Sequence, residues 1–333
     1  MSAEPKSWKE WEKDLMELDQ ALHKLKERLD AAKPEDRERL EQTIRDAERR
    51  RDNYISHTYG RLTPWKEVLV ARAEPRPYTL DYIGALFEDF VELQGDRRFG
   101  GDNAIIGGPA EFRNKPVMVV GHQKGRNIQE RQFRNFAMAR PEGYRKAIRL
   151  FQMADRFRMP IITFVDTPAA DPGVESESRG ISEAIAASIL AMFELTVPVM
   201  SVVVGEGGSG GAIGIGIGNQ VLMLEHAVYS VIPPEGCAAI LWRDAALGPQ
   251  AAQALRLTAK DALELGLVDE VLPEPFGAAH RDPIKTFETV GDAIAKHLKA
   301  LEGLSPEALR EKRYDKFRGM GRFGPAEAVP RLF

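Results

Sequence analysis

The sequence predicts an α/β protein with a helical hairpin at its N-terminus. Three strand-like segments rich in β-branched residues each follow a proline, Pro116, Pro160 or Pro198, at intervals of 44 and 38 residues. Such intervals suit repeated strand–helix units, and proline fits the first position of a strand because no ladder donor is needed there. A heptad pattern occupies only the first part of the chain. We therefore expect a helical hairpin over residues 1–60 and an α/β domain with C-terminal helices over residues 61–333.

The N-terminal hairpin is predicted from an apolar seam. Residues spaced alternately three and four positions apart are Trp8, Trp11, Leu15, Leu18, Leu22, Leu25 and Leu29. Pro34 interrupts the pattern, which resumes with Leu40, Ile44 and Ala47 among charges of both signs. An apolar stripe of this kind needs a partner. Packing on the chain itself and packing on another subunit are both open, and the balanced charges indicate a solvated face rather than a nucleic-acid surface.

The α/β elements are predicted in order along the chain. Strands are expected at 117–121, 161–166, 199–204, 227–232 and 268–272, with amphipathic helices at 144–157 and 181–193 between the first three. Thr258 and Asp261 resemble a capping box at the start of a further helix, and Gly266 is its expected C-terminal stop. The order of elements is typical of a domain with an extensive buried sheet.

Composition excludes several classes of protein. The net charge of −4 gives no overall attraction to nucleic acid or to an anionic membrane. The single cysteine, Cys237, excludes a disulfide framework and a zinc site built from several thiolates within this chain, so no metal site is expected. The charged N-terminus and the lack of an apolar run long enough to cross a bilayer predict a cytoplasmic protein.

The segment from Val202 to Gly218 is unusually rich in glycine and matches two motifs at once. Gly205, Gly207 and Gly210 form a G-x-G-x-x-G dinucleotide fingerprint, with Glu225 twenty residues after the first glycine. That fingerprint requires a long helix after its last glycine, whereas few residues and three more glycines precede the next strand. The dinucleotide interpretation is therefore disfavoured.

The same segment contains the nucleophile elbow G-x-S-x-G around Ser209. Asp269 and His280 follow in the order that a serine hydrolase requires. An Asp–His pair follows almost any serine in a chain with six histidines, so the match is weak. The serine hydrolase nevertheless stays open as an alternative of a different class.

A third interpretation uses only the backbone. A strand, a tight glycine turn and a short buried helix beginning at Gly210, Gly211 and Ala212 would point successive N–H groups into one cavity. Such donors carry partial positive charge and suit an oxyanion. Glycines in this turn would let a planar substrate reach the amides, although close packing of helix on sheet is an alternative reason for them.

Several long motifs place the chain near one known family. They are the segments Gly121–Asn127, Arg134–Leu150, Arg158–Gly173, Gly205–Asn219, Tyr229–Trp242 and Pro273–Pro283. In this order they closely resemble the carboxyltransferase alpha subunits of bacterial acetyl-CoA carboxylases. The resemblance implies a crotonase/ClpP-like fold of stacked ββα units. It also implies an α2β2 assembly with a zinc-containing beta subunit, a biotin carboxyl carrier protein, and biotin carboxylase in the larger complex.

The resemblance implies a reaction that needs no side-chain base in this chain. Carboxybiotin on the carrier would break down to CO2 and a biotin oxyanion, which removes the α-proton of acetyl-CoA, and the enolate attacks CO2 to give malonyl-CoA for fatty acid synthesis. Gly210 and Gly211 match the pair whose amides hold the biotin oxygen. Further substrate-binding positions are expected at Gly207, Gly208, Ala212, Lys124, Arg126, Ala169, Glu235 and Gly236.

The chain departs from the family pattern in one loop. Ala169 stands where the family has glycine, and Asp171 stands where it has tyrosine. Alanine disfavours the positive-φ conformations that glycine tolerates, and aspartate adds a negative charge near an anionic substrate. Two further alternatives therefore stay open: the carboxyltransferase part of a biotin-dependent acyl-CoA decarboxylase, and a non-catalytic scaffold.

Overall fold

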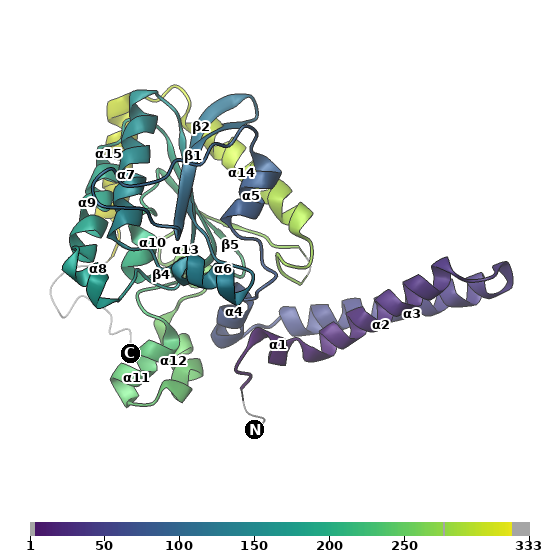
Figure 1. Ribbon diagram of the computed structural model, residues 1–333. Helices are drawn as coiled ribbons and strands as arrows, with labels where there is room; N and C mark the ends of the chain where they lie inside the picture. The colour runs from purple at the N-terminus through teal and green to yellow at the C-terminus, as the bar shows by residue number, and fades with distance from the viewer. Residues whose placement is uncertain (1–3, 276, 322–333) are drawn as a thin grey trace.

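The computed structural model describes residues 4–275 and 277–321, and its centre is one mixed β-sheet (Figure 1). The strands follow the order β1-β2-β3-β4-β5-β7, with β6 paired to β4. Their bounds are β1 Ile105–Phe112, β2 Lys115–His122, β3 Ile161–Thr167, β4 Val199–Gly208, β5 Gln220–Leu224, β6 Val228–Ser230 and β7 Glu270–Leu272. Of these strand pairs, β1–β2 is antiparallel and the others are parallel. The α/β class is confirmed.

The three segments predicted as buried strands after prolines are β2, β3 and β4, which lie next to one another within the sheet. Every residue of β3 and of β4 is buried, which parallel strands covered on both faces require. Helices α7 (Pro141–Arg156) and α9 (Ile181–Glu194) pack side by side, while α5 (Thr79–Leu86) and α14 (Pro283–Leu301) lie on the other side of the strands (Figure 1). The carboxyl ends of β3 and β4 meet at one edge of this core.

Two predicted strands are shorter in the structure than expected, and for one of them the hydrogen bonds of the flanking turns show the reason. The strand expected at 227–232 is limited to β6, since Ala227 N–H bonds the Leu224 carbonyl and the Ser230 hydroxyl bonds the Ile232 carbonyl. The strand expected at 268–272 begins only at Glu270. The capping box of Thr258 and Asp261 is confirmed at the start of α13 (Ala259–Glu264), and Gly266 has a φ of +71° beyond its end.

The remaining helices connect these elements. They are α4 Pro64–Ala71, α6 Ile128–Phe133, α8 Val174–Ser178, α10 Ser209–Ile213, α11 Pro234–Trp242, α12 Gly248–Leu255 and α15 Pro306–Arg318, with 3₁₀ turns η1 Asn135–Ala137 and η2 Ala245–Leu247. None of the helices in the described ranges is both long enough and apolar enough to cross a membrane. Residues 322–333 of the predicted second domain lie outside the described residues.

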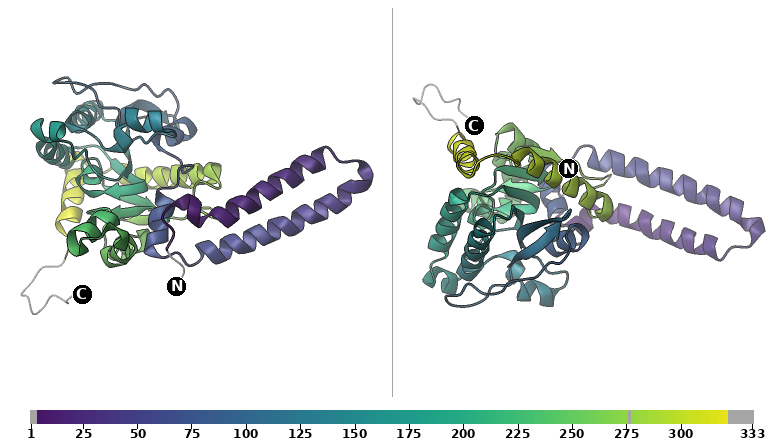
Figure 2. Two further views of the ribbon diagram at one scale, coloured as in Figure 1. Left: turned by 60° about the horizontal axis from the view of Figure 1, so that its bottom comes forward. Right: turned by 90° about the horizontal axis from the view of Figure 1, so that it is seen from above.

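The N-terminal helices α1 (Trp8–Trp11), α2 (Lys13–Asp30) and α3 (Pro34–Tyr59) form a hairpin that projects from the body of the protein (Figures 1 and 2). Helices α2 and α3 pack along each other, and Leu15, Leu22 and Ile44 are buried in this seam. Leu25 and Leu29 nearer the tip are only half-buried. The apolar stripe is thus used largely within the hairpin itself.

Glu12 fastens the root of the hairpin to the C-terminal part of the sheet domain. Its carboxylate is 1% exposed and pairs with His280 Nε2 at 3.2 Å and Arg281 Nη2 at 2.9 Å. The Tyr59 hydroxyl donates to the same carboxylate, so both arms of the hairpin share this anchor.

Replacing Glu12 with alanine is expected to loosen the hairpin without unfolding the sheet domain. The change leaves the charge of Arg281 with Asp19 alone and removes the acceptor of His280. Limited proteolysis should then cut between residues 60 and 64 at least several-fold faster than in the parent protein. Equal cutting rates would show that Glu12 does not anchor the hairpin.

Candidate active site

The glycine turn joins β4 to α10 and packs directly on the loop that follows β3. A Cβ atom at Gly208 would lie 1.9 Å from the Pro168 carbonyl oxygen, and one at Gly211 would lie 2.5 Å from the Ala169 carbonyl carbon. Both neighbours are backbone atoms, which cannot move aside as a flexible side chain can. Glycine is therefore required at both positions, and Gly208 and Gly211 pack on the loop that contains Ala169, with Gly207 and Ala212 as their chain neighbours.

Ser209 begins α10 with a φ of +51°, so the chain bends sharply between strand and helix. Helix α10 has five residues, far fewer than a dinucleotide fingerprint requires. The first N–H groups of a helix have no partner within it, and here they belong to small residues. At Gly210 an added Cβ would lie 3.3 Å from Ile185 Cδ1, a tight contact that a small shift of this side chain would relieve.

The predicted hydrolase residues have separate partners. Asp269 accepts from the Val221 N–H at 2.6 Å and pairs with Lys316 at 2.7 Å. His280 belongs to the hairpin anchor described above. Among the described residues, neither is hydrogen-bonded to Ser209, so the structure shows no assembled serine triad.

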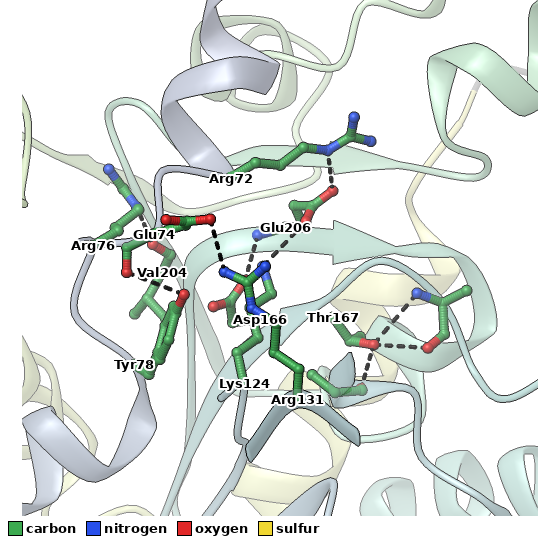
Figure 3. A network of polar contacts seen from close by, with 12 residues as sticks. Arg72, Glu74, Arg76, Tyr78, Lys124, Arg131, Asp166, Thr167, Val204 and Glu206 are labelled. Carbon is green, nitrogen blue, oxygen red and sulfur yellow. Dashed lines mark hydrogen bonds and ion pairs between the residues drawn. The ribbon is translucent and has the colours of Figure 1, made fainter. Parts of the chain in front are cut away.

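A chain of ion pairs lies beside the glycine turn (Figure 3). Lys124 Nζ is 2.7 Å from Asp166 Oδ1 and 3.1 Å from Glu206 Oε1. Asp166 is the last residue but one of β3, Lys124 lies two residues beyond the end of β2, and Glu206 directly precedes Gly207 on β4. The carboxyl-terminal parts of three neighbouring strands therefore bring these residues together. The Glu206 N–H also donates to Asp166 at 2.8 Å. We call this group the ion-pair chain; Arg72 and Glu235, described below, extend it.

These contacts favour the charged forms of Glu206 and Lys124, whereas burial raises the pKa of Asp166 despite the nearby Lys124 ammonium. Burial favours the neutral form of Glu206, but the charges of Lys124 and Arg72 outweigh it and lower the pKa of Glu206 to about 2. Burial likewise favours neutral Lys124, but Asp166 and Glu206 raise the pKa of its ammonium. His122, buried in the adjacent strand, has a pKa lowered by burial and by Lys124 to about 3, so it is neutral near pH 7.

A cavity of about 240 Å³ opens beside this chain of charges. Its lining includes Tyr78, Lys124, Arg131, Phe136 and Pro168. Pro168 also belongs to the loop that packs on the glycine turn. The cavity and the turn therefore share one wall, which makes this edge of the sheet the candidate active site.

The other predicted site residues are placed as follows. Glu235 pairs with Arg72 at 2.6 Å and so joins the ion-pair chain, with Gly236 next to it in α11. Arg126 has other partners: it donates to the Glu74 and Arg76 carbonyls, pairs with Asp81 and lies over the Tyr78 ring at 3.9 Å. Lys124 and Glu235 are thus connected to the glycine turn through ion pairs. Arg126 instead bonds the segment between α4 and α5.

The altered loop residues are accommodated locally. Ala169 does not have a positive φ, so alanine fits this backbone without the conformational freedom of glycine. The Asp171 carboxylate accepts from the Ser176 hydroxyl at 2.6 Å and from the Gly173 N–H at 3.3 Å. The carboxylate also lies 3.6 Å from Arg140 Nε, at the start of α7, so its charge is paired locally.

Sequence reasoning missed Glu206 and Arg72 as parts of the site. The signal for Glu206 was a single charged residue inside an otherwise apolar and glycine-rich strand. Arg72 carried no such signal, because its partners lie 134 and 163 residues away in the sequence. Within the described ranges, no three His, Cys, Asp or Glu side chains are grouped so as to hold a metal ion.

Comparison with known proteins gives the family. Residues 8–321 match the family described as acetyl co-enzyme A carboxylase carboxyltransferase-like. A protein of Geobacter metallireducens named acetyl-coenzyme A carboxylase carboxyl transferase subunit alpha is 53% identical over 94% of this chain and 97% of its own length. A protein of the same name from Thermus thermophilus is 52% identical over 94% of this chain and 98% of its own length. The chain belongs to this family.

Solved structures show that the acetyl-CoA carboxylase carboxyltransferase-like chain has the predicted crotonase-type fold. The core of transcarboxylase 12S has a TM-score of 0.53 at 20% identity, covering 79% of this chain and 45% of that one. The beta subunit of Pseudomonas aeruginosa geranyl-CoA carboxylase also has a TM-score of 0.53, at 17% identity, covering 74% and 46%. These remote likenesses concern the fold alone, and they confirm its class.

Proposed function

We propose that this chain is the alpha subunit of a carboxyltransferase that moves a carboxyl group from carboxybiotin to acetyl-CoA. Membership of the acetyl-CoA carboxylase carboxyltransferase family supports this reaction. The observation that carries the assignment of the site is the glycine turn, where backbone atoms pack so closely that Gly208 and Gly211 admit no side chain. A backbone site suits a reaction whose base comes from the substrate.

In the proposed reaction the N–CO2 bond of carboxybiotin breaks, which gives CO2 and a negative charge on the biotin ureido group. That anion accepts the α-proton of acetyl-CoA, and the resulting enolate carbon forms a bond to CO2, which gives malonyl-CoA. The amides of Gly210 and Gly211 would hold the ureido oxygen while it carries charge. Donors fixed at the start of α10 stabilise such charge without reorganising during the reaction.

The proposal includes partners. The thioester oxyanion of acetyl-CoA needs its own donors, which we assign to a beta subunit in an α2β2 assembly that also carries the zinc. The biotin carboxyl carrier protein would bring carboxybiotin, charged by biotin carboxylase, to the open side of the glycine turn. Together these partners would supply what the described part of this chain does not itself provide.

The direct test is forward transfer with the carboxylated carrier protein and acetyl-CoA. Malonyl-CoA should form only when this chain and a family beta subunit are both present. A stable complex that forms no malonyl-CoA would favour the scaffold alternative and would contradict the proposed function.

Replacing Ser209 with alanine is expected to lower transfer less than threefold. The proposed chemistry uses the amides of the turn and not the serine hydroxyl, and alanine differs from serine here by one side-chain atom. A fluorophosphonate probe should likewise leave Ser209 unlabelled. Complete loss of activity in the variant, together with labelling of the parent protein, would instead support the serine hydrolase.

A further inference from the structure

Arg72 connects two elements that border the glycine turn. It directly follows α4, and its Nε donates to Glu206 Oε2 at 2.7 Å while Nη1 donates to Glu235 Oε1 at 2.6 Å. Glu206 lies on β4 immediately before Gly207, and Glu235 lies in the first turn of α11. A guanidinium presents its donors in a rigid planar fork, so one arginine holds two carboxylates at a set separation.

We call Arg72, Glu206 and Glu235 the clamp. Its end on β4, Glu206, is held by further ion pairs. Glu206 is 8% exposed, and its second carboxylate oxygen pairs with Lys124, which in turn pairs with Asp166 (Figure 3). Glu206 therefore offers Arg72 a fixed point of attachment next to the glycine turn. Movement of Arg72 relative to β4 would cost contacts along the whole ion-pair chain.

The other end of the clamp holds a protruding lobe, which we define as α11, η2 and α12 (Pro234–Leu255) (Figure 1). Helix α12 is anchored by apolar packing, since Ala252 belongs to a buried cluster with Trp65 and Val68 of α4. Helix α11 instead exposes Ile240 and Leu241, which are 72% and 64% exposed. In the described part of the chain, Arg72–Glu235 is the one ion pair that ties α11 to the body.

The start of α11 lies very close to the glycine turn. A cavity of only about 20 Å³ separates them, lined by Gly207, Gly208 and Pro168 on one side, Pro233 and Pro234 on the other, and Arg72 in its wall. A space of this size holds about one water molecule. A small shift of α11 would therefore change the approach to the turn.

We propose that Arg72 is a positioning residue that sets the first turn of α11 against the glycine turn and thereby sets the affinity for the biotin-side substrate. The predicted effect on substrate affinity rests on the proposed function. The prediction that Arg72 holds α11 in place does not depend on that function. Arg72 acts on α11 through Glu206 and Glu235, although it also lines the cavity of about 240 Å³ beside the glycine turn.

The clamp is tested first by hydrogen exchange on the full-length chain. In Arg72→Met, the amides of α11 should exchange at least tenfold faster than in the parent protein, with those of α7 and β3 unchanged. Glu235→Gln should reproduce the effect with a single neutral substitution if Arg72→Met fails to fold. Arg113→Met is the matched control, because Arg113, in the turn between β1 and β2, pairs with Asp292 of α14, far along the chain from α11. Unchanged exchange of α11 in the folded variants would overturn the clamp.

The positioning role is tested with the reconstituted subunits, malonyl-CoA and free biotin. Arg72→Met and Glu235→Gln should raise the KM for biotin at least tenfold while changing the KM for malonyl-CoA less than twofold. Arg72→Lys should recover only part of this loss, since an ammonium lacks the planar fork. Equal changes in both KM values, or none despite faster exchange of α11, would overturn the role. An inactive parent complex would refute the proposed function and leave the exchange result to decide the clamp.

Discussion

Replacing Gly210 with valine is expected to lower carboxyl transfer by about 10²–10³, because a donor whose access is blocked should cost as much as a donor that is lost. The structure favours this position because, among the described residues, an added Cβ would meet only the Ile185 side chain, 3.3 Å from Cδ1 and 3.8 Å from Cγ2, and the shift required is small. The valine methyl groups would then stand between the substrate and the amides of the turn. Steady-state kinetics of the reconstituted subunits should show the loss mainly in kcat.

Gly84→Val provides the matched control for this substitution. Gly84 lies in α5, with no atom within 4 Å of an added Cβ. Transfer by this variant should equal that of the parent protein, and both variants should have unchanged circular dichroism and unchanged binding to the beta subunit. Full activity in Gly210→Val would show that the amides of the turn do not hold the reacting oxygen.

Replacing Lys124 with methionine is expected to cost about 3–5 kcal/mol of folding free energy. The substitution leaves Asp166 without its cation and Glu206 with Arg72 alone, and both carboxylates are buried. Adding Asp166→Asn to the variant should recover part of the loss, because the uncompensated charge is removed. Urea unfolding of each protein measures these differences.

Lys115→Met is the control for the loss of a lysine ion pair. Lys115 pairs with Glu302 at the surface, where both side chains are more than half exposed. Exposed pairs contribute about 0–1 kcal/mol, so this variant should unfold near the parent midpoint. Similar stabilities for Lys124→Met and Lys115→Met would show that the buried ion pairs do not support the site.

Local patterns were enough to predict the core of the fold. The strands after Pro116, Pro160 and Pro198 are largely apolar and rich in β-branched residues, and the heptad seam predicted α2 and α3. The first strand, β1, was missed because its sequence, with Gly107, Gly108 and Pro109, lacks both alternation and a continuous apolar run. Pairing with β2 along its whole length stabilises β1, although its own sequence has little β-propensity.

The candidate site was predictable only where its signal was local. A dense run of glycines indicated the turn, and the structure gives the reason in the backbone atoms of Pro168 and Ala169. The ion-pair chain depends on residues that are distant in sequence, such as Arg72 and Glu235, and no local sequence pattern predicts such pairs. The prediction that Lys124 and Arg126 act alike also rested on their proximity in sequence, whereas the structure places them in different sets of contacts.

The central claim is that this chain supplies the biotin side of a shared active site, and the reverse reaction tests it most directly. Malonyl-CoA and free biotin are incubated with this chain, with a family beta subunit, or with both, and loss of malonyl-CoA is followed. The account predicts loss only in the mixture, with a rate that saturates as biotin is raised. Loss of malonyl-CoA that needs no biotin, or no loss from a stable complex, would contradict it.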